Sequence, residues 1–258
     1  MSRILEALEK AHREAGPARP AGAAGHRAGI FALPGATRTV SVPTSALRKV
    51  GWVSALSPPP RGSQVFAALA DRLCNWAPVP ARVLVCGATR RAGTTAASLN
   101  LATELALTGD HTALWCEVPY PRNRAWEFLG SACRHGLADH LRRDLPLRDL
   151  LVRTQVPRLT LLPGRGTATP ALPPPDGEAL SRFLEEVAGR SPDRYVVVDA
   201  PPPTECAATV RLAASCEATV LVVATGTSQQ TLAEVKEALG EIPRCAVLLN
   251  RAPRLLGG

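Results

Sequence analysis

Short apolar runs alternate with longer stretches of helical periodicity along most of the chain. The apolar runs cover residues 50–56, 83–86, 112–116, 159–162, 195–198, 218–223 and 245–249. Helical periodicity covers residues 62–76, 94–108, 176–189, 204–214 and 228–239, and a mixture of helix and loop covers 124–151. Apolar strands separated by amphipathic helices indicate a parallel sheet covered by helices on both faces. The predicted fold class is therefore α/β, with a doubly wound, mostly parallel sheet.

The N-terminal part of the chain has a different pattern. Residues 2–15 predict a short amphipathic helix, because Ile4, Leu5, Leu8 and Ala11 fall on one helical face behind a capping Ser2. Such a helix is marginal alone in water, so we expect it to dock on its own domain or on a partner. Residues 16–48 are rich in Gly, Pro, Ala and Arg without a period. The predicted organisation is a docking helix at 1–15, a disordered basic linker at 16–48 and an α/β domain at 49–254.

Charge and composition limit the classes of function. Residues 1–61 hold nine Lys/Arg and three Asp/Glu, so they supply +6 of the net charge of +8. A basic tail suits an acidic partner or an anionic membrane surface, or is simply a solvated linker. The nearly neutral remainder argues against a nucleic-acid partner. The first residues do not form a signal peptide and no apolar run is long enough to span a membrane, so we expect a cytoplasmic protein that is not transmembrane.

Seven cysteines occur without a C-x-x-C pair. Cys86, Cys116 and Cys245 fall inside predicted strands, where a thiol acts as a small buried apolar group. The cysteines therefore favour a structural role over a metal or redox site.

Residues 88–95 have the frame of a phosphate-binding loop, [Ala/Gly]-x4-Gly-Lys-[Ser/Thr], between a predicted strand and helix. The frame begins at Ala88, and Thr94 stands at the lysine position. Gly93 allows close approach of a phosphate, and the hydroxyl of Thr95 is at the position that contacts Mg²⁺. Arg90 and Arg91 offer positive charge, although a guanidinium differs from an ammonium in geometry. The sequence thus predicts a loop with a phosphate-binding backbone that lacks its lysine.

Polar residues follow three further apolar strands. Asp199 ends the run Val196–Val198, as in a Walker B strand where an aspartate positions Mg²⁺, although a capping or turn role is the alternative. Glu117 ends the strand after the loop. Asn250, followed by Arg251, ends the last strand, where an amide can pair with a purine edge or simply terminate the strand. Ligands of doubly wound sheets bind beyond the carboxyl ends of the strands, so these residues are expected to share one site.

Together these segments resemble the bacterial tyrosine kinases, the cytoplasmic partners of polysaccharide chain-length regulators, within the wider MinD/ParA-like group of P-loop proteins. The resemblance covers about residues 49–254. It rests on the loop with Asn100-Leu101-Ala102 in its helix, on Gly136-Leu137-Ala138-Asp139, on Tyr195–Pro202 and on Leu248–Arg251. The opening MSRILEALEKA is also similar to the N-terminal helix of some members of the group. The resemblance implies ATP or ADP with Mg²⁺ held by Thr95, Glu117 and Asp199, and a nucleotide contacted by the loop, Asn250 and Arg251.

The departures from the family pattern concern function. Thr94 replaces the lysine, and the Asp-x-Asp of the second strand is Glu117 and Pro119 here. The charges that support ring assembly are replaced by Gln64, Ala67 and Ala70, and no tyrosine follows Tyr195. Loss of one charge aimed at a developing anion typically costs roughly 10²–10³ in rate. No intact catalytic set is therefore expected, and any nucleotide is expected to be weakly held or absent.

Three hypotheses about function follow. The first is a degenerate tyrosine-kinase-like regulator or adaptor of exopolysaccharide or capsule synthesis and export. Its N-terminal helix would hold it to a membrane chain-length regulator, or another export-complex protein, at the inner membrane. The second is an active ATP-dependent tyrosine kinase or ATPase in which Arg90 or Arg91 replaces the lysine. The third is a MinD/ParA-like positioning protein.

Overall fold

The computed structural model describes residues 38–251, except 122, 124, 131, 132, 171, 172, 174, 175 and 243. The chain divides into two units, residues 1–30 and residues 31–258, and the first unit lies wholly outside the described residues. The predicted docking helix at 1–15 and the linker up to residue 37 also lie outside them.

The described residues form one eight-stranded sheet in the order β1-β4-β5-β3-β6-β2-β7-β8. Neighbouring strands are parallel except β4 and β5, which are antiparallel. The mostly parallel α/β sheet confirms the predicted fold class. The strands are β1 (Arg38–Thr39), β2 (Ala81–Gly87), β3 (Thr112–Glu117), β4 (Val152–Arg153), β5 (Leu159–Leu162), β6 (Arg194–Ala200), β7 (Ala218–Ala224) and β8 (Cys245–Asn250).

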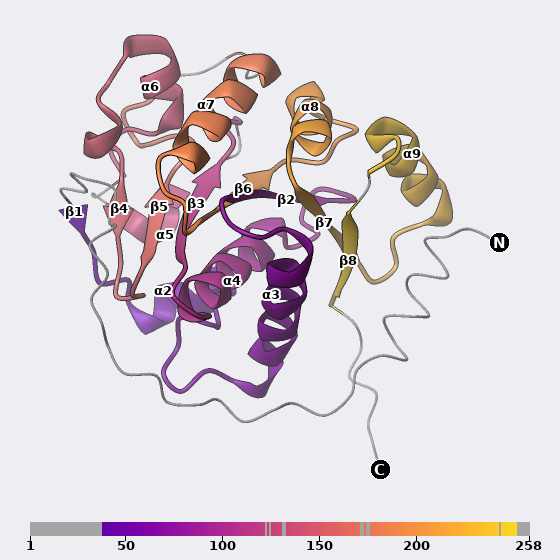
Figure 1. Cartoon of the computed structure of the whole chain (residues 1–258), viewed down its shortest axis with the longest axis horizontal. Helices are drawn as coiled ribbons and strands as arrows, with labels where there is room; N and C mark the ends of the chain where they lie inside the picture. The colour runs from indigo at the N-terminus through magenta and orange to yellow at the C-terminus, as the bar shows by residue number, and fades with distance from the viewer. Residues whose placement is uncertain are drawn as a thin grey trace. The chain divides into compact units, whose positions relative to one another are not determined.

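Helices cover both faces of this sheet (Figure 1). One apolar cluster packs the sheet against α2 (Thr44–Val50), α3 (Gln64–Trp76), α4 (Thr94–Leu107) and α5 (Ala125–Leu129). The other packs it against α6 (Leu137–Arg143), α7 (Gly177–Gly189), α8 (Ala207–Ser215) and α9 (Gln229–Leu239). Short 3₁₀ helices occur at η1 (Arg61–Ser63) and η3 (Leu147–Asp149). Among the described helices, none combines the length and hydrophobicity that crossing a membrane requires.

Burial on both faces explains why the central strands are apolar throughout. In β6, Tyr195 and Val197 join the cluster under α3 and α4, whereas Val196 and Val198 join the cluster under α7 and α8. Alternation of side chains along a strand produces this division. All seven residues of β6 are buried, including Arg194 and Asp199. The apolar runs of the sequence thus mark the strands whose ends carry the candidate site.

Two predicted segments need correction. The interval 38–48 does not belong to a disordered linker, because β1 pairs with β4 and α2 begins at Thr44. Strand β8 lies at the end of the sheet order, so Cys245 is exposed rather than buried, whereas Cys86 and Cys116 are buried as predicted.

The predicted strand at 50–56 is wrong. Gly51 adopts a left-handed conformation with φ of 77° and ends α2. The indole of the fully buried Trp52 then donates to Thr103 Oγ1 at 2.7 Å, and Ser54 N–H donates to Asn100 Oδ1 at 2.7 Å. These apolar residues are therefore buried against α4, not by pairing in the sheet.

Candidate functional site

The predicted phosphate-binding loop, residues 88–95, connects β2 to α4 at the carboxyl edge of the sheet. Gly93 is in a left-handed conformation with φ of 94°, and Arg91 is in the same region with φ of 60°. Ala88 and Ala92 are buried, so the loop packs onto the protein as it turns. The first N–H groups of a helix have no acceptor within it, so the start of α4 presents donors suited to an anion.

Asn250 holds this loop closed. Its Nδ2 donates to the carbonyl of Ala92 at 2.8 Å, and its Oδ1 accepts from Arg251 N–H at 2.9 Å. A Cβ on Gly93 would lie 2.1 Å from the same Nδ2, so this close approach requires glycine. The side-chain amide that is predicted to meet a purine edge is thus hydrogen-bonded to the loop and to the backbone N–H of Arg251. A contact of Asn250 with a purine edge stays a prediction.

Thr94, at the lysine position, lies against the end of β2. A Cβ on Gly87 would come within 2.6 Å of Thr94 Oγ1 and 2.8 Å of the carbonyl of Thr89. The short hydroxyl side chain therefore packs beside strand β2. It also carries no charge, so it cannot replace an ammonium that binds phosphate.

Of the two loop arginines, Arg90 is engaged outside the loop. Arg90 Nε donates to Glu205 Oε2 at 2.5 Å, and the hydroxyl of Tyr120 lies 3.4 Å from the same oxygen. This ion pair with Glu205 raises the pKa of Arg90. Arg91 is exposed. In this arrangement the guanidinium of Arg90 therefore points to Glu205, a residue that follows β6.

Two acids meet beside the loop. Glu117 and Asp199 are register partners on the adjacent strands β3 and β6, and they are 2% and 5% exposed. Burial raises the pKa of Asp199 to about 8; the neighbouring Glu117 acts in the same direction, and the hydroxyls of Thr95 and Ser98 act against it. Two carboxyl groups are thus held together in a buried place where ionising both is costly.

The side chains around Asp199 are fixed by hydrogen bonds. The indole of Trp115 donates to Ser98 Oγ at 2.8 Å, and Ser98 Oγ donates to the carbonyl of Thr95 at 3.0 Å. Trp115 and Ser98 are fully buried. This chain of bonds joins β3 to the first turns of α4 and keeps Thr95 next to the acid, as the sequence predicted.

A second loop, at residues 163–170, closes on Glu117. The N–H of Gly164 donates to Glu117 Oε2 at 3.0 Å. A Cβ on Gly164 would lie 2.7 Å from the carbonyl of Glu117, so the approach requires glycine there. The sequence analysis missed this contact. The sequence feature that could have indicated this contact is Gly164, in the pair Pro163-Gly164 directly after β5. Strand β5 is next to β3 in the sheet.

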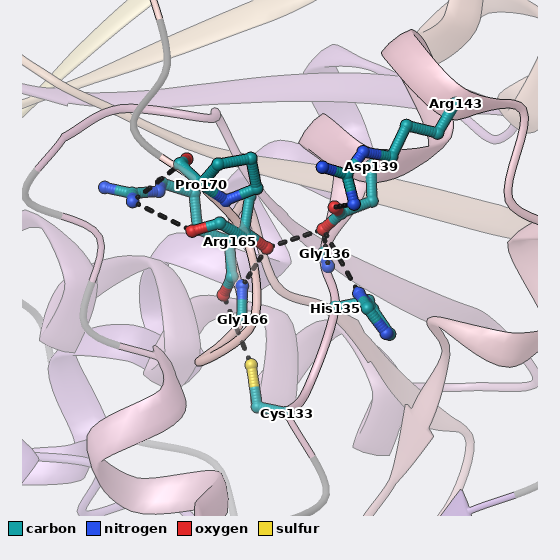
Figure 2. A network of polar contacts seen from close by, with 9 residues as sticks. Cys133, His135, Gly136, Asp139, Arg143, Arg165, Gly166 and Pro170 are labelled. Carbon is teal, nitrogen blue, oxygen red and sulfur yellow. Dashed lines mark hydrogen bonds and ion pairs between the residues drawn. The ribbon is translucent and has the colours of Figure 1, made fainter.

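Asp139, the acid of the Gly-Leu-Ala-Asp turn, ties that second loop in place (Figure 2). Its Oδ2 accepts from Gly136 N–H at 3.0 Å and from Thr169 Oγ1 at 2.5 Å. Thr169 Oγ1 in turn accepts from Gly166 N–H at 2.8 Å. The turn that carries part of the family resemblance thus has a structural task, because it positions the loop that contacts Glu117.

The residues present fit a divalent cation better than they fit a triphosphate. Buried carboxylates with a neighbouring hydroxyl form the oxygen set that Mg²⁺ prefers, and a cation would relieve their mutual repulsion. Within the described residues no cluster of three or more His, Cys, Asp or Glu forms a metal site, so Thr95 and phosphate oxygens would have to complete the coordination. The backbone at the start of α4 offers N–H donors for an anion, whereas Thr94 and Pro119 stand where the family resemblance implies a lysine and a second acid.

One of the family departures has a simpler explanation. Ala70 lies on α3 and is fully buried in the core. On the same helix, Ala67 is half-buried and Gln64 is exposed. A charged side chain at position 70 would be buried, so alanine is explained there by packing. The missing ring charges therefore carry less weight than the missing lysine.

Comparison with solved structures identifies the architecture. The kinase domain of Escherichia coli tyrosine kinase ETK superposes with a TM-score of 0.62 at 17% identity, over 80% of this chain and 84% of that one. The chimerical protein CapA2B2 gives a TM-score of 0.66 at 15% identity, over 84% of this chain and 94% of that one. The fold is that of the bacterial tyrosine kinase domains. It is shared with a chain of the MinC:MinD cell division protein complex of Aquifex aeolicus, with a TM-score of 0.54 at 18% identity over 67% of this chain and 69% of that one.

The resemblance predicted from the sequence is thus confirmed at the level of the fold. No family model matches the chain, and no curated protein matches it. Identities of this size establish a common architecture and leave activity to be argued from the site.

Proposed function

We propose that the protein is a degenerate tyrosine-kinase-like P-loop protein that acts as a regulator or adaptor in exopolysaccharide or capsule synthesis and export. In this proposal it works in the cytoplasm and is held at the inner membrane by a partner. The partner is a membrane chain-length regulator or another protein of the export complex, reached through residues 1–15. The shared fold of the kinase domains supports the general class, and the site supports the loss of catalysis.

The observation that carries the proposal is the uncharged Thr94 packed against β2. Phosphoryl transfer depends almost entirely on positioning and on charge that stabilises the transferred group. Here Arg90 pairs with Glu205 outside the loop, and Pro119 supplies no second acid. A scaffold that keeps its loop backbone but lacks these charges favours binding over transfer.

The two tyrosines also support this proposal. Tyr195 is 1% exposed, and its hydroxyl donates to the carbonyl of Ala77 at 3.2 Å. It is therefore a core residue and a poor phosphate acceptor. Tyr120 is half-buried beside Glu205, and phosphorylation there would place a second negative charge next to a carboxylate.

A second candidate function, an ATP-dependent kinase or ATPase, is favoured by the buried pair Glu117 and Asp199. Ionising both carboxyl groups in this buried place is unfavourable, and a cation would offset that cost, so the pair supports binding of Mg²⁺, with or without ADP or ATP. This candidate requires a charge to enter the loop when nucleotide binds. Release of Arg90 from Glu205 is the rearrangement that would provide it.

Complementation tests the regulatory role. We expect deletion of the gene to lower polysaccharide yield or chain length in the source organism. We expect the Asp199→Asn variant, which cannot hold a catalytic metal, to restore both to the wild-type level. Failure of a stably folded Asp199→Asn protein to complement would favour the enzymatic candidate. An unchanged polysaccharide in the deletion strain would contradict both.

A further inference from the structure

A cleft opens on the α7 side of the sheet, near the amino end of β6. Its volume is about 450 Å³, and its lining includes Leu147, Leu151, Arg148, Arg190 and Arg194. The first three come from η3 and the segment after it, whereas the others come from the end of α7 and the start of β6. Three arginines from separate parts of the sequence thus face one cavity. The site described above uses none of them.

Arg194 is the unusual member of this group. It is only 3% exposed, yet among the described residues its guanidinium makes one hydrogen bond, from Nη1 to the carbonyl of Val187 at 3.3 Å. A guanidinium has five N–H donors, so most of its donor capacity is unused by these residues. Burial lowers the pKa of Arg194, Asp193 acts against this, and nearby Arg190 lowers it further. The other guanidinium nitrogens of Arg194 are not among the buried atoms that lack a partner, so they reach the open cleft, where an anion can accept hydrogen bonds from them.

The other two arginines stand at the entrance. Their side chains are 66% exposed for Arg148 and 54% exposed for Arg190. Arg190 pairs with Glu186 on the same helix, and Arg148 lies 3.9 Å from Asp149. An exposed ion pair such as that between Arg190 and Glu186 is weak, so the guanidinium of Arg190 can turn to a ligand at little cost. Neither acid lines the cleft.

The shape and chemistry of the cleft indicate the class of ligand. Guanidinium groups bind phosphate through paired, parallel hydrogen bonds, and three of them favour a dianion over a carboxylate. The volume falls in the range of small-molecule sites, and leucine side chains offer an apolar wall. A small organic phosphate matches these features better than a flat protein surface does.

The cleft is separate from the phosphate-binding loop. Arg194 begins β6 and Asp199 lies five positions later, so the two sites are roughly 16 Å apart along the strand at about 3.3 Å per residue. Arg194 lies on the same face of β6 as Val196 and Val198, which α7 and α8 cover. The loop lies at the opposite, carboxyl edge of the sheet.

We propose that Arg148, Arg190 and Arg194 form a second anion site, which binds a small phosphate-bearing molecule. The site would let a phosphorylated compound regulate the protein without occupying the P-loop. The inference goes beyond the proposed function and does not depend on it.

Amide NMR of the full-length, ¹⁵N-labelled protein tests the site, with pyrophosphate as the probe at low salt. We expect saturable shifts of the amides of Leu147, Ser191 and Arg194, separate from any shifts at residues 89–95. Arg148→Gln and Arg190→Gln are expected to weaken binding by about tenfold each, the size of one lost charged hydrogen bond. Because both residues are exposed, these variants should fold even if Arg194→Gln does not.

The matched control is Arg182→Gln, which removes the same charge from an exposed position on α7. It should leave the affinity unchanged, and acetate should bind at least about tenfold more weakly than pyrophosphate. Shifts confined to residues 89–95 would place the probe on the P-loop and overturn the proposal. Absence of saturable binding at the cleft, equal binding of acetate, or equal affinity in the Arg148, Arg190 and Arg182 variants would overturn it as well.

Discussion

The acid side of the candidate site and its phosphate side differ in what they retain. On the acid side, Glu117 and Asp199 are buried together, and a hydroxyl of α4 stands beside them. On the phosphate side, the backbone turn is intact, but Thr94 is uncharged and Arg90 is paired elsewhere. The first side keeps two buried carboxyl groups that can hold a cation, and the second has no lysine to meet a phosphate.

This difference indicates what the site can do. Buried acids are costly, so a chain that keeps them without a ligand loses stability. On the phosphate side, the short side chain of Thr94 fits beside Gly87, where a Cβ would lie 2.6 Å from its Oγ1. One molecule can therefore bind a cation and yet be unable to transfer a phosphate.

The largest expected effect is on stability. Folded Asp199 holds its proton up to about pH 8, whereas the unfolded residue loses it near 4, so the folded state binds more protons between these values. The free energy of unfolding should therefore fall as pH rises from about 5 to 8, by up to about 1.4 kcal/mol per pH unit from this group. Urea titrations at several pH values should show that the free energy of unfolding falls less steeply with pH in Asp199→Asn than in the wild type. Mg²⁺ should stabilise the wild type at pH 8 and not the variant; equal Mg²⁺ effects in both would refute the cation site.

Restoring the lysine should increase the affinity of the loop for a nucleotide. Thr94→Lys places an ammonium at the start of α4 and is expected to tighten ATP binding by roughly 10- to 100-fold, the range of one or two charged hydrogen bonds. Thr94→Met, of similar length and without charge, is the control and should not tighten it. Calorimetric titration with Mg-ATP measures both. If Lys and Met variants bind alike, the missing charge is not what limits the loop.

Asn250→Ala tests how the loop is held. The change removes the hydrogen bond from Nδ2 to the carbonyl of Ala92, so we expect a loss of about 1 kcal/mol in stability. Faster amide exchange should appear at residues 91–94. Asn75→Ala, at an exposed position on α3, is the matched control and should change neither quantity. A loss of preference for purine nucleotides without loss of loop protection would instead support the purine-edge hypothesis.

The smallest effect is expected for Arg90→Ala. The side chain is exposed and bonded to Glu205, so its removal should not measurably change stability. If Arg90 replaced the lysine, the variant would lose Mg-ATP affinity; we expect the affinity to match that of the wild type. Fluorescence titration with a labelled nucleotide analogue compares the two. A drop of tenfold or more would revive the enzymatic candidate.

Much of the fold could be predicted because burial on both faces makes the central strands apolar throughout, as β6 illustrates. Strand ends also placed Glu117 and Asp199 together, since parallel neighbours end at one edge. The segment 50–56 was missed because an apolar run does not tell whether it is buried by a sheet or by α4. The contact from Gly164 was missed because it depends on how Asp139 folds a distant loop. The engagement of Asn250 with Ala92 likewise depends on the path of the loop in three dimensions.

A phosphotransfer assay with purified full-length protein and radiolabelled Mg-ATP tests the central claim most directly. The account predicts no label on the protein above the level of the Asp199→Asn variant, over times at which an active kinase labels itself fully. Labelling of Tyr120 that disappears in Asp199→Asn would contradict it, because the loop would then transfer a phosphate without its lysine.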